Sequence, residues 1–151
     1  VSPEGLPAEF ADYFEGVVAL RAPEPERNVA LKAWERLLAR PTAERKYKST
    51  WAAYMLGKLW DEEDDTKAVA YFQMTRTLAK QRFADSAGLA VAAIGLEARI
   101  ELRRKNFRSA IELYLAQFAA GPARHLLPRP SRVGLHRRDA ERHGPRGLRP
   151  V

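Results

Sequence analysis

An alanine followed four residues later by an aromatic residue recurs three times in this chain. The three pairs are Ala30 with Trp34, Ala68 with Phe72, and Ala110 with Tyr114. The interval from the second pair to the third is slightly longer than that from the first to the second, so the connectors vary in length. On a helix, a four-residue offset places both side chains on one face, where the alanine admits a neighbouring helix and the ring fills the space beside it. The recurrence predicts stacked helix pairs, each too small to bury its own apolar face.

The composition is that of one globular domain with enough apolar residues for a core, since 46% of the 151 residues are hydrophobic. The chain contains no cysteine, which excludes disulfide scaffolds, thiolate metal sites and thiol catalysis. Its longest apolar-rich run, Ala87 to Leu96, is about half as long as a membrane span. The sequence starts at Val1 without a methionine, so a removed leader or a fragment stays open, and composition leaves the compartment undetermined.

Six helices are predicted, and no segment shows the sustained alternation or β-branched run of a strand. Their expected ranges are Ala8 to Leu20, Pro25 to Arg40, Thr42 to Trp60, Asp64 or Asp65 to Gln81, Asp85 or Ser86 to Lys105, and Asn106 to Gly121. Prolines, a final glycine and capping side chains mark the boundaries. The sequence therefore predicts an all-α protein of about three antiparallel helix pairs, followed by an irregular basic tail.

The helical region, about residues 8–120, resembles the tetratricopeptide repeat (TPR) family. The residues that match or stand at the family's repeat-core positions are Ala30, Trp34, Leu56, Gly57, Ala68, Phe72, Ala98, Ala110 and Tyr114. The spacings here are longer than the family repeat of about 34 residues, Ala53 replaces the expected first-helix tryptophan, and the leading helix of the first unit matches poorly. The resemblance implies a TPR-like superhelix that acts as a non-enzymatic scaffold for protein–protein interaction.

TPR-like proteins usually bind through the concave surface that their first helices line. The resemblance places Trp51, Tyr54, Lys58 and Asp61 on that surface, and their offsets of three, four and three residues form one stripe on a helix. The equivalent stripe in the next unit is Ala92, Gly95, Arg99 and Arg103. Together they predict an aromatic patch beside a basic one, suited to an extended peptide with an acidic group. The alternative is that both rings belong to the core and that the arginines are a solvated helix face.

The densest charge run of the helical region is Asp61 to Asp65. A calcium loop needs alternating ligands and a glycine turn, and this run has neither. An acidic helix start is favoured by the helix dipole and accounts for the run, so no metal is expected.

Catalysis has few candidate groups, because residues 1–120 contain neither histidine nor cysteine and no glycine-rich phosphate loop. Glu97 and Glu101 lie four residues apart and resemble a paired-acid site. The surrounding arginines and Lys105 instead favour a surface ladder of salt bridges. We therefore expect neither an enzyme nor a cofactor.

The net charge of +7 is concentrated in the last part of the chain. Residues 1–120 hold 18 Lys or Arg and 17 Asp or Glu, whereas residues 121–151 hold eight Arg, no Lys and two acids. The predicted domains are accordingly 1–121, helical, and 122–151, a tail rich in Arg, Pro and Gly. Three interpretations of the tail stay open: an out-of-frame translation of GC-rich DNA, a disordered segment, or a nucleic-acid-binding segment that neutralises phosphates. The last is the alternative to a protein-binding function.

The last predicted helix, Asn106 to Ala120, carries an apolar stripe for which the sequence offers no covering helix. Its residues are Ile111, Leu115 and Phe118. Terminal repeats normally need a polar cap, and exposed apolar faces drive association. The sequence therefore predicts self-association through this helix.

Overall fold

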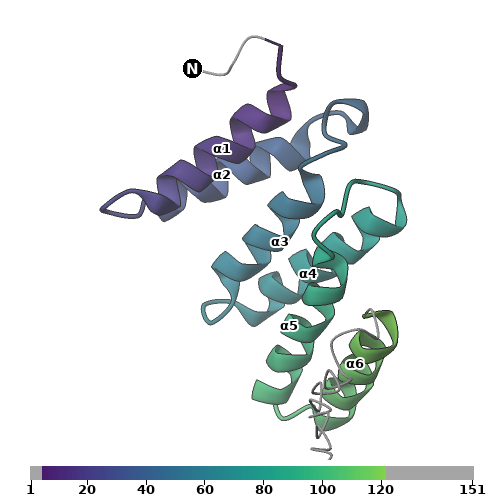
Figure 1. Ribbon diagram of the computed structural model, residues 1–151. Coiled ribbons are helices and arrows are strands. Elements are labelled where there is room, and N and C mark those ends of the chain that lie inside the picture. The colour runs from purple at the N-terminus through teal and green to yellow at the C-terminus, as the bar shows by residue number, and fades with distance from the viewer. Residues whose placement is uncertain (1–4, 122–151) are drawn as a thin grey trace, which may run out of the picture. The chain divides into compact units, whose positions relative to one another are not determined.

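The structure, a computed structural model, describes residues 5–121, and these form six α-helices joined by short connectors (Figure 1). The helices are α1 (Ala8–Arg21), α2 (Arg27–Ala39), α3 (Ser49–Trp60), α4 (Asp65–Lys80), α5 (Leu89–Arg103) and α6 (Phe107–Ala120). A single turn of 3₁₀-helix, η1 (Thr42–Glu44), precedes α3, and no strand occurs within the described residues. The all-α class predicted from the sequence is confirmed.

Helices that are neighbours in sequence pack side by side, as α1 with α2, α3 with α4, and α5 with α6 (Figure 1). Successive pairs are joined by contacts of α2 with α3 and of α4 with α5. In addition, α3 contacts α5, so the first helices of the second and third pairs are neighbours. Each pair thus covers an apolar face of the next, as expected for pairs too small to form separate cores.

The α4 and α5 helices begin where capping side chains are available. The Asp64 carboxylate accepts the backbone N–H groups of Thr66 and Lys67 at 3.1 and 3.0 Å, which satisfies donors that the first turn of α4 leaves free. Before α5, Gly88 takes a left-handed conformation with φ of 68°, where glycine avoids the Cβ clash. Asp85 lies upstream of that glycine and still accepts the Leu89 N–H at 2.6 Å.

The prediction of one helix from Thr42 to Trp60 is wrong. After η1 the chain makes a turn, and α3 starts only at Ser49. The carboxylate of Glu9 on α1 accepts the backbone N–H of Tyr47 at 3.1 Å and that of Lys48 at 2.7 Å. These charge-assisted bonds stabilise the start of α3 from another helix, so Thr42 is not needed as its cap.

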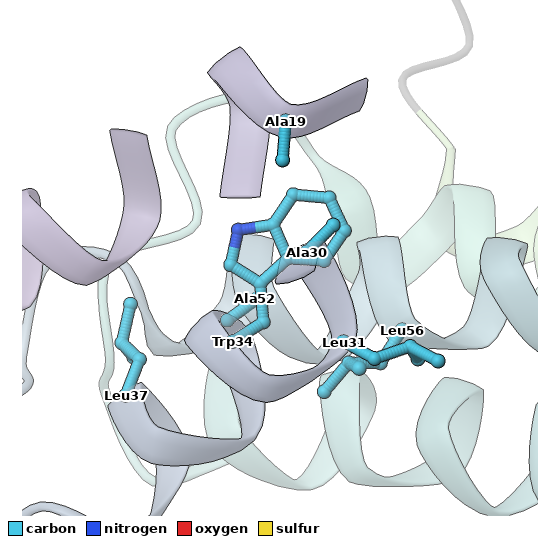
Figure 2. Packing of buried hydrophobic residues seen from close by; sticks show 7 residues of the cluster. All are labelled: Ala19, Ala30, Leu31, Trp34, Leu37, Ala52 and Leu56. Atoms are coloured by element: carbon cyan, nitrogen blue, oxygen red, sulfur yellow. The ribbon is translucent and has the colours of Figure 1, made fainter. Parts of the chain in front are cut away.

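The core is built around the aromatic side chains of the second helices. Figure 2 shows the Trp34 indole of α2 pointing toward Ala19 of α1, with Ala30 and Ala52 close to the same ring. Phe72 of α4 is the corresponding ring of the next cluster. Both rings are fully buried, so within their helix pairs these are the side chains that bury the most apolar surface.

The three recurring alanines are all buried, and Ala110 is the one buried residue of α6. The rings that follow them divide differently. Trp34 and Phe72 are completely buried, whereas Tyr114 is 42% exposed. The Tyr114 ring is exposed because α6 has no described helix packed against it on this side. In the preceding pairs, α3 covers α2 and α5 covers α4.

Candidate functional site

The two aromatic residues of the expected binding surface are half-buried on α3. The Trp51 ring makes an edge contact with Tyr13 of α1, with ring centroids 6.2 Å apart. Tyr54 packs against Phe72 of α4, with centroids 6.1 Å apart, and Lys58 holds its ammonium 6.0 Å from the Tyr54 ring. Each ring therefore has one part in a helix–helix contact and another part at the surface, which leaves it able to touch a ligand without being free to move.

The charged residues of the surface meet at the turn between α3 and α4. Asp61 pairs with Arg99 and Arg103, both of which come from α5, and the Arg103 Nη2 lies 3.0 Å from Asp61 Oδ1. The Asp61 side chain is only 8% exposed, whereas that of Arg99 is 54% exposed. One carboxylate is thus enclosed by two guanidinium groups whose outer edges face solvent.

Most acidic residues of the run Asp61 to Asp65 form such ion pairs or cap α4. Asp65 pairs with Arg103 and with Arg104, the latter at 3.4 Å, and Asp64 caps α4. Hydrogen bonding to Arg103 holds the pKa of Asp65 below its ordinary value. This arrangement explains why the acids follow one another at the start of α4 and face the arginine-rich end of α5.

Tyr54 connects the aromatic and basic parts of the surface electrostatically. Burial raises the pKa of the Tyr54 hydroxyl, and the positive charge of Arg99 offsets part of that rise. The structure brings Asp61, Arg99 and Arg103 together and places Lys58 by the Tyr54 ring, whereas Trp51 lies near the start of α3 against α1.

The residues of the expected stripe on α5 do not form one exposed surface, because Gly95 faces α6. A Cβ at this position would lie 2.7 Å from the side-chain oxygen of Gln117, so this side of α5 faces α6. The Gln117 amide also donates to the Val91 carbonyl at 3.3 Å. Gly95 is therefore a packing position of the α5–α6 pair, and Arg99 and Arg103 carry the exposed part of the stripe.

Nearly all repeat-core positions lie in the helix–helix contacts. The buried members of the set are Ala30, Trp34, Leu56, Gly57, Ala68, Phe72, Ala98 and Ala110, and Tyr114 is the exposed member. The sequence pattern thus locates where the helices touch. It overestimates the burial of Tyr114, the third aromatic residue of the pattern.

Three buried carboxylates are not distinguished by sequence reasoning. Glu9 binds the start of α3, and Asp12 accepts from Arg36 of α2 at 2.7 Å and from Arg40, the residue that follows α2, at 2.5 Å. The expectation that Glu97 belongs to a surface ladder is wrong, because Glu97 is buried, accepts from Gln73 at 2.9 Å and pairs with an arginine of α4. Each of these groups connects helices, because a buried charge persists only with partners that replace its water.

Within residues 5–121 no group of three or more potential metal ligands occurs. No helix of that range is long and apolar enough to cross a membrane. The tail and any role of its arginines lie outside the described residues. Comparisons with known proteins give no relative: no protein-family model matches the sequence, no curated protein sequence matches it, and no solved structure matches the fold.

Proposed function

We propose that this chain is a TPR-like, non-enzymatic scaffold that binds a peptide or helix of a partner protein through the surface where α3 faces α5. The observation that carries the proposal is the Asp61 carboxylate held between Arg99 and Arg103, at the end of the α3 stripe that also carries the half-buried Tyr54. The successive helix pairs and the contact of α3 with α5 support the TPR-like arrangement, because they make first helices neighbours.

The chemistry of this surface favours an acidic peptide with an apolar side chain. An arginine has five N–H donors, and the carboxylates of Asp61 and Asp65 cannot accept all those of two arginines. The exposed edges of Arg99 and Arg103 therefore keep donors for a carboxylate of the partner. Tyr54 and Lys58 lie on the α3 stripe that leads to Asp61, and a ring that is already fixed by packing binds with little loss of conformational entropy.

The test measures the affinity of fluorescein-labelled peptides, each with two or three Asp or Glu residues next to a Leu or Phe, by fluorescence anisotropy. The double variant Arg99→Ala, Arg103→Ala is expected to bind the best peptide about tenfold more weakly than the natural sequence. Arg108→Ala is the matched control, because Arg108 is a highly exposed arginine on α6. It is expected to change the affinity by less than about twofold.

Asp61→Asn provides a second variant with the opposite expected effect. It removes the carboxylate that competes for both arginines, so an acidic peptide should bind more tightly if the arginines are the binding groups. Equal affinity for the natural sequence and the double arginine variant would contradict the proposal. An equal loss for Arg108→Ala would indicate attraction by overall charge instead of a defined surface.

A further inference from the structure

The first helices α3 and α5 use equivalent positions, related by one constant spacing in the sequence, when they pack onto the preceding pair. These positions are Ala52 and Ala93, Met55 and Leu96, and Leu59 and Ile100. The α3 residues belong to the cluster around Trp34 of α2, and the α5 residues belong to the cluster around Phe72 of α4. At the joint between one helix pair and the next, the first helix therefore presents the same face each time.

The same face on α1 is exposed. The spacing that relates α5 to α3, applied once more towards the N-terminus, gives Ala11, Phe14 and Val18. Phe14 is 51% exposed and Val18 is 67% exposed, although both are large apolar side chains. Glu15, which lies between them, directs its carboxylate to Arg36 of its own chain at 2.5 Å. This leaves an apolar stripe on α1 at the positions that α3 and α5 use for packing.

The opposite half of the joint is exposed on α6. When α4 and α6 are aligned on their recurring alanines, the α6 residues Ile111, Tyr114 and Phe118 correspond to Val69, Phe72 and Arg76 of α4. Those α4 residues contact α5: Phe72 packs with Ala93 and Ile100, and Arg76 pairs with Glu97 at 2.5 Å. In α6, Ile111 is 59% exposed and Phe118 is 64% exposed.

We infer that copies of this chain associate head to tail, with the α6 face of one copy packed on the α1 face of the next. The two exposed stripes occupy the positions that meet each other in the α2–α3 and α4–α5 contacts of the same chain. A second copy therefore presents the kind of helix that each face already accepts within the fold. The contact uses different surfaces on the two partners, so each growing end keeps one free face. Because it continues the stacking of helix pairs within the chain, we expect an open array instead of a closed ring.

Sedimentation equilibrium of the full 151-residue chain over a wide concentration range tests this inference. The weight-average mass is expected to rise continuously through the dimer value without a plateau, as open association requires. Val18→Glu and Ile111→Glu each place a charge in one half of the joint, and both side chains are mostly exposed, so little packing within the monomer is disturbed. Each variant should lower the association constant at least about tenfold.

The decisive experiment mixes the two variants. The Val18→Glu chain keeps its α6 face and the Ile111→Glu chain keeps its α1 face, so an equimolar mixture should form a dimer with one copy of each and stop there. Met74→Glu is the control, since Met74 is an exposed apolar residue of α4 outside both stripes. It should associate like the natural sequence, and circular dichroism should show the same helix content for all four proteins.

Two results would overturn the inference. A natural chain that stays monomeric over the whole range would mean that something in the same chain covers the α6 face. A dimer that survives Val18→Glu and is lost only with Ile111→Glu, with no recovery in the mixture, would mean that two α6 helices pack symmetrically.

Discussion

The indole ring of Trp34 on α2 lies directly against the backbone of Gly16 on α1. A Cβ built on Gly16 would stand 2.5 Å from Cε2 of that ring, a distance that real side chains do not reach. The indole is fully buried, and its Nε1 donates to the Tyr13 carbonyl at 3.1 Å. The ring can therefore neither rotate away nor move outward without losing a hydrogen bond. Helix α1 approaches α2 this closely because residue 16 has no side chain.

Gly16→Ala is expected to destabilise the protein. The methyl group overpacks the indole at a cost of about 1–3 kcal/mol, reduced by the better helix propensity of alanine, which contributes about 1 kcal/mol. Thermal unfolding followed by circular dichroism measures the result. For a domain of this size, each kcal/mol corresponds to a change in Tm of about 4 °C.

Gly95→Ala is the matched control. Its methyl group would meet the side-chain amide of Gln117, the end of a flexible chain that can move aside. The propensity gain should then dominate, and the Tm should stay the same or rise. Gly57→Ala, which meets the Phe72 ring at 2.6 Å, should behave like Gly16→Ala. Similar changes in Tm for all three variants would contradict the explanation.

The glycines also show how far the sequence alone predicts this fold. The recurrence of alanine and aromatic residues predicts stacked helix pairs, and the apolar pattern with its boundary residues predicts six helices. The TPR pattern identifies Leu56-Gly57 as a packing position. It misses Gly16, because the first helix matches that pattern poorly. The signal is nevertheless present: Tyr13 and Gly16 of α1 recur in α3, in the same order and with the same separation, as Tyr54 and Gly57. A search for this recurrence finds the first-helix repeat without a structure.

Recurring patterns in the sequence do not identify which acidic residues are buried. Glu9, Asp12 and Glu97 have the same local pattern as exposed helix carboxylates, and each has at least one partner 24 or more residues away in the sequence. Only the packing of helices decides which carboxylate is buried. The same limit applies to the candidate surface, because the sequence places Arg99 and Arg103 on one face but contains no reason for both to meet Asp61.

Ala110→Leu should destabilise the helical unit, because Ala110 is buried in the contact between α5 and α6. The added side chain would overpack that contact at a cost of about 1–3 kcal/mol. Ala119→Leu is the control on the same helix, since Ala119 is exposed. Urea denaturation of both variants measures the difference, and equal free energies of unfolding would mean that α6 does not depend on this contact.

Asp12→Asn should alter the acid limb of the stability curve. Burial alone would raise the pKa of Asp12, but hydrogen bonds from Arg40 and Arg36 outweigh burial and hold the pKa below its ordinary value. The folded state therefore binds this proton less readily than the unfolded state, so the group contributes stability above the unfolded pKa of about 4. That contribution is lost as the pH falls through the lower pKa of the folded state.

The expected result is that, as the pH falls below about 4, the natural sequence loses stability more steeply than Asp12→Asn does. At neutral pH the variant should be less stable, since two arginines lose their charged partner. Glu15→Gln is the control, because among residues 5–121 its half-exposed carboxylate pairs with Arg36 alone. Parallel curves for the natural sequence and Asp12→Asn would exclude Asp12 as a source of the pH dependence.

Glu9→Gln tests whether one residue of α1 determines where α3 begins. The Glu9 carboxylate is buried and accepts two backbone N–H groups just before Ser49, and a glutamine oxygen can accept them only without the negative charge. Hydrogen bonds to a charged group contribute roughly 1.5–3 kcal/mol, about twice a neutral bond, so a loss of about 1–2 kcal/mol is expected. Hydrogen exchange should rise at the Tyr47 and Lys48 amides before the rest of α3 is affected. Glu44→Gln, an exposed acid of the preceding η1 turn, should leave both measurements unchanged. If Glu9→Gln unfolds at the same urea concentration as the natural sequence and protects the two amides equally well, the start of α3 is set by its own residues.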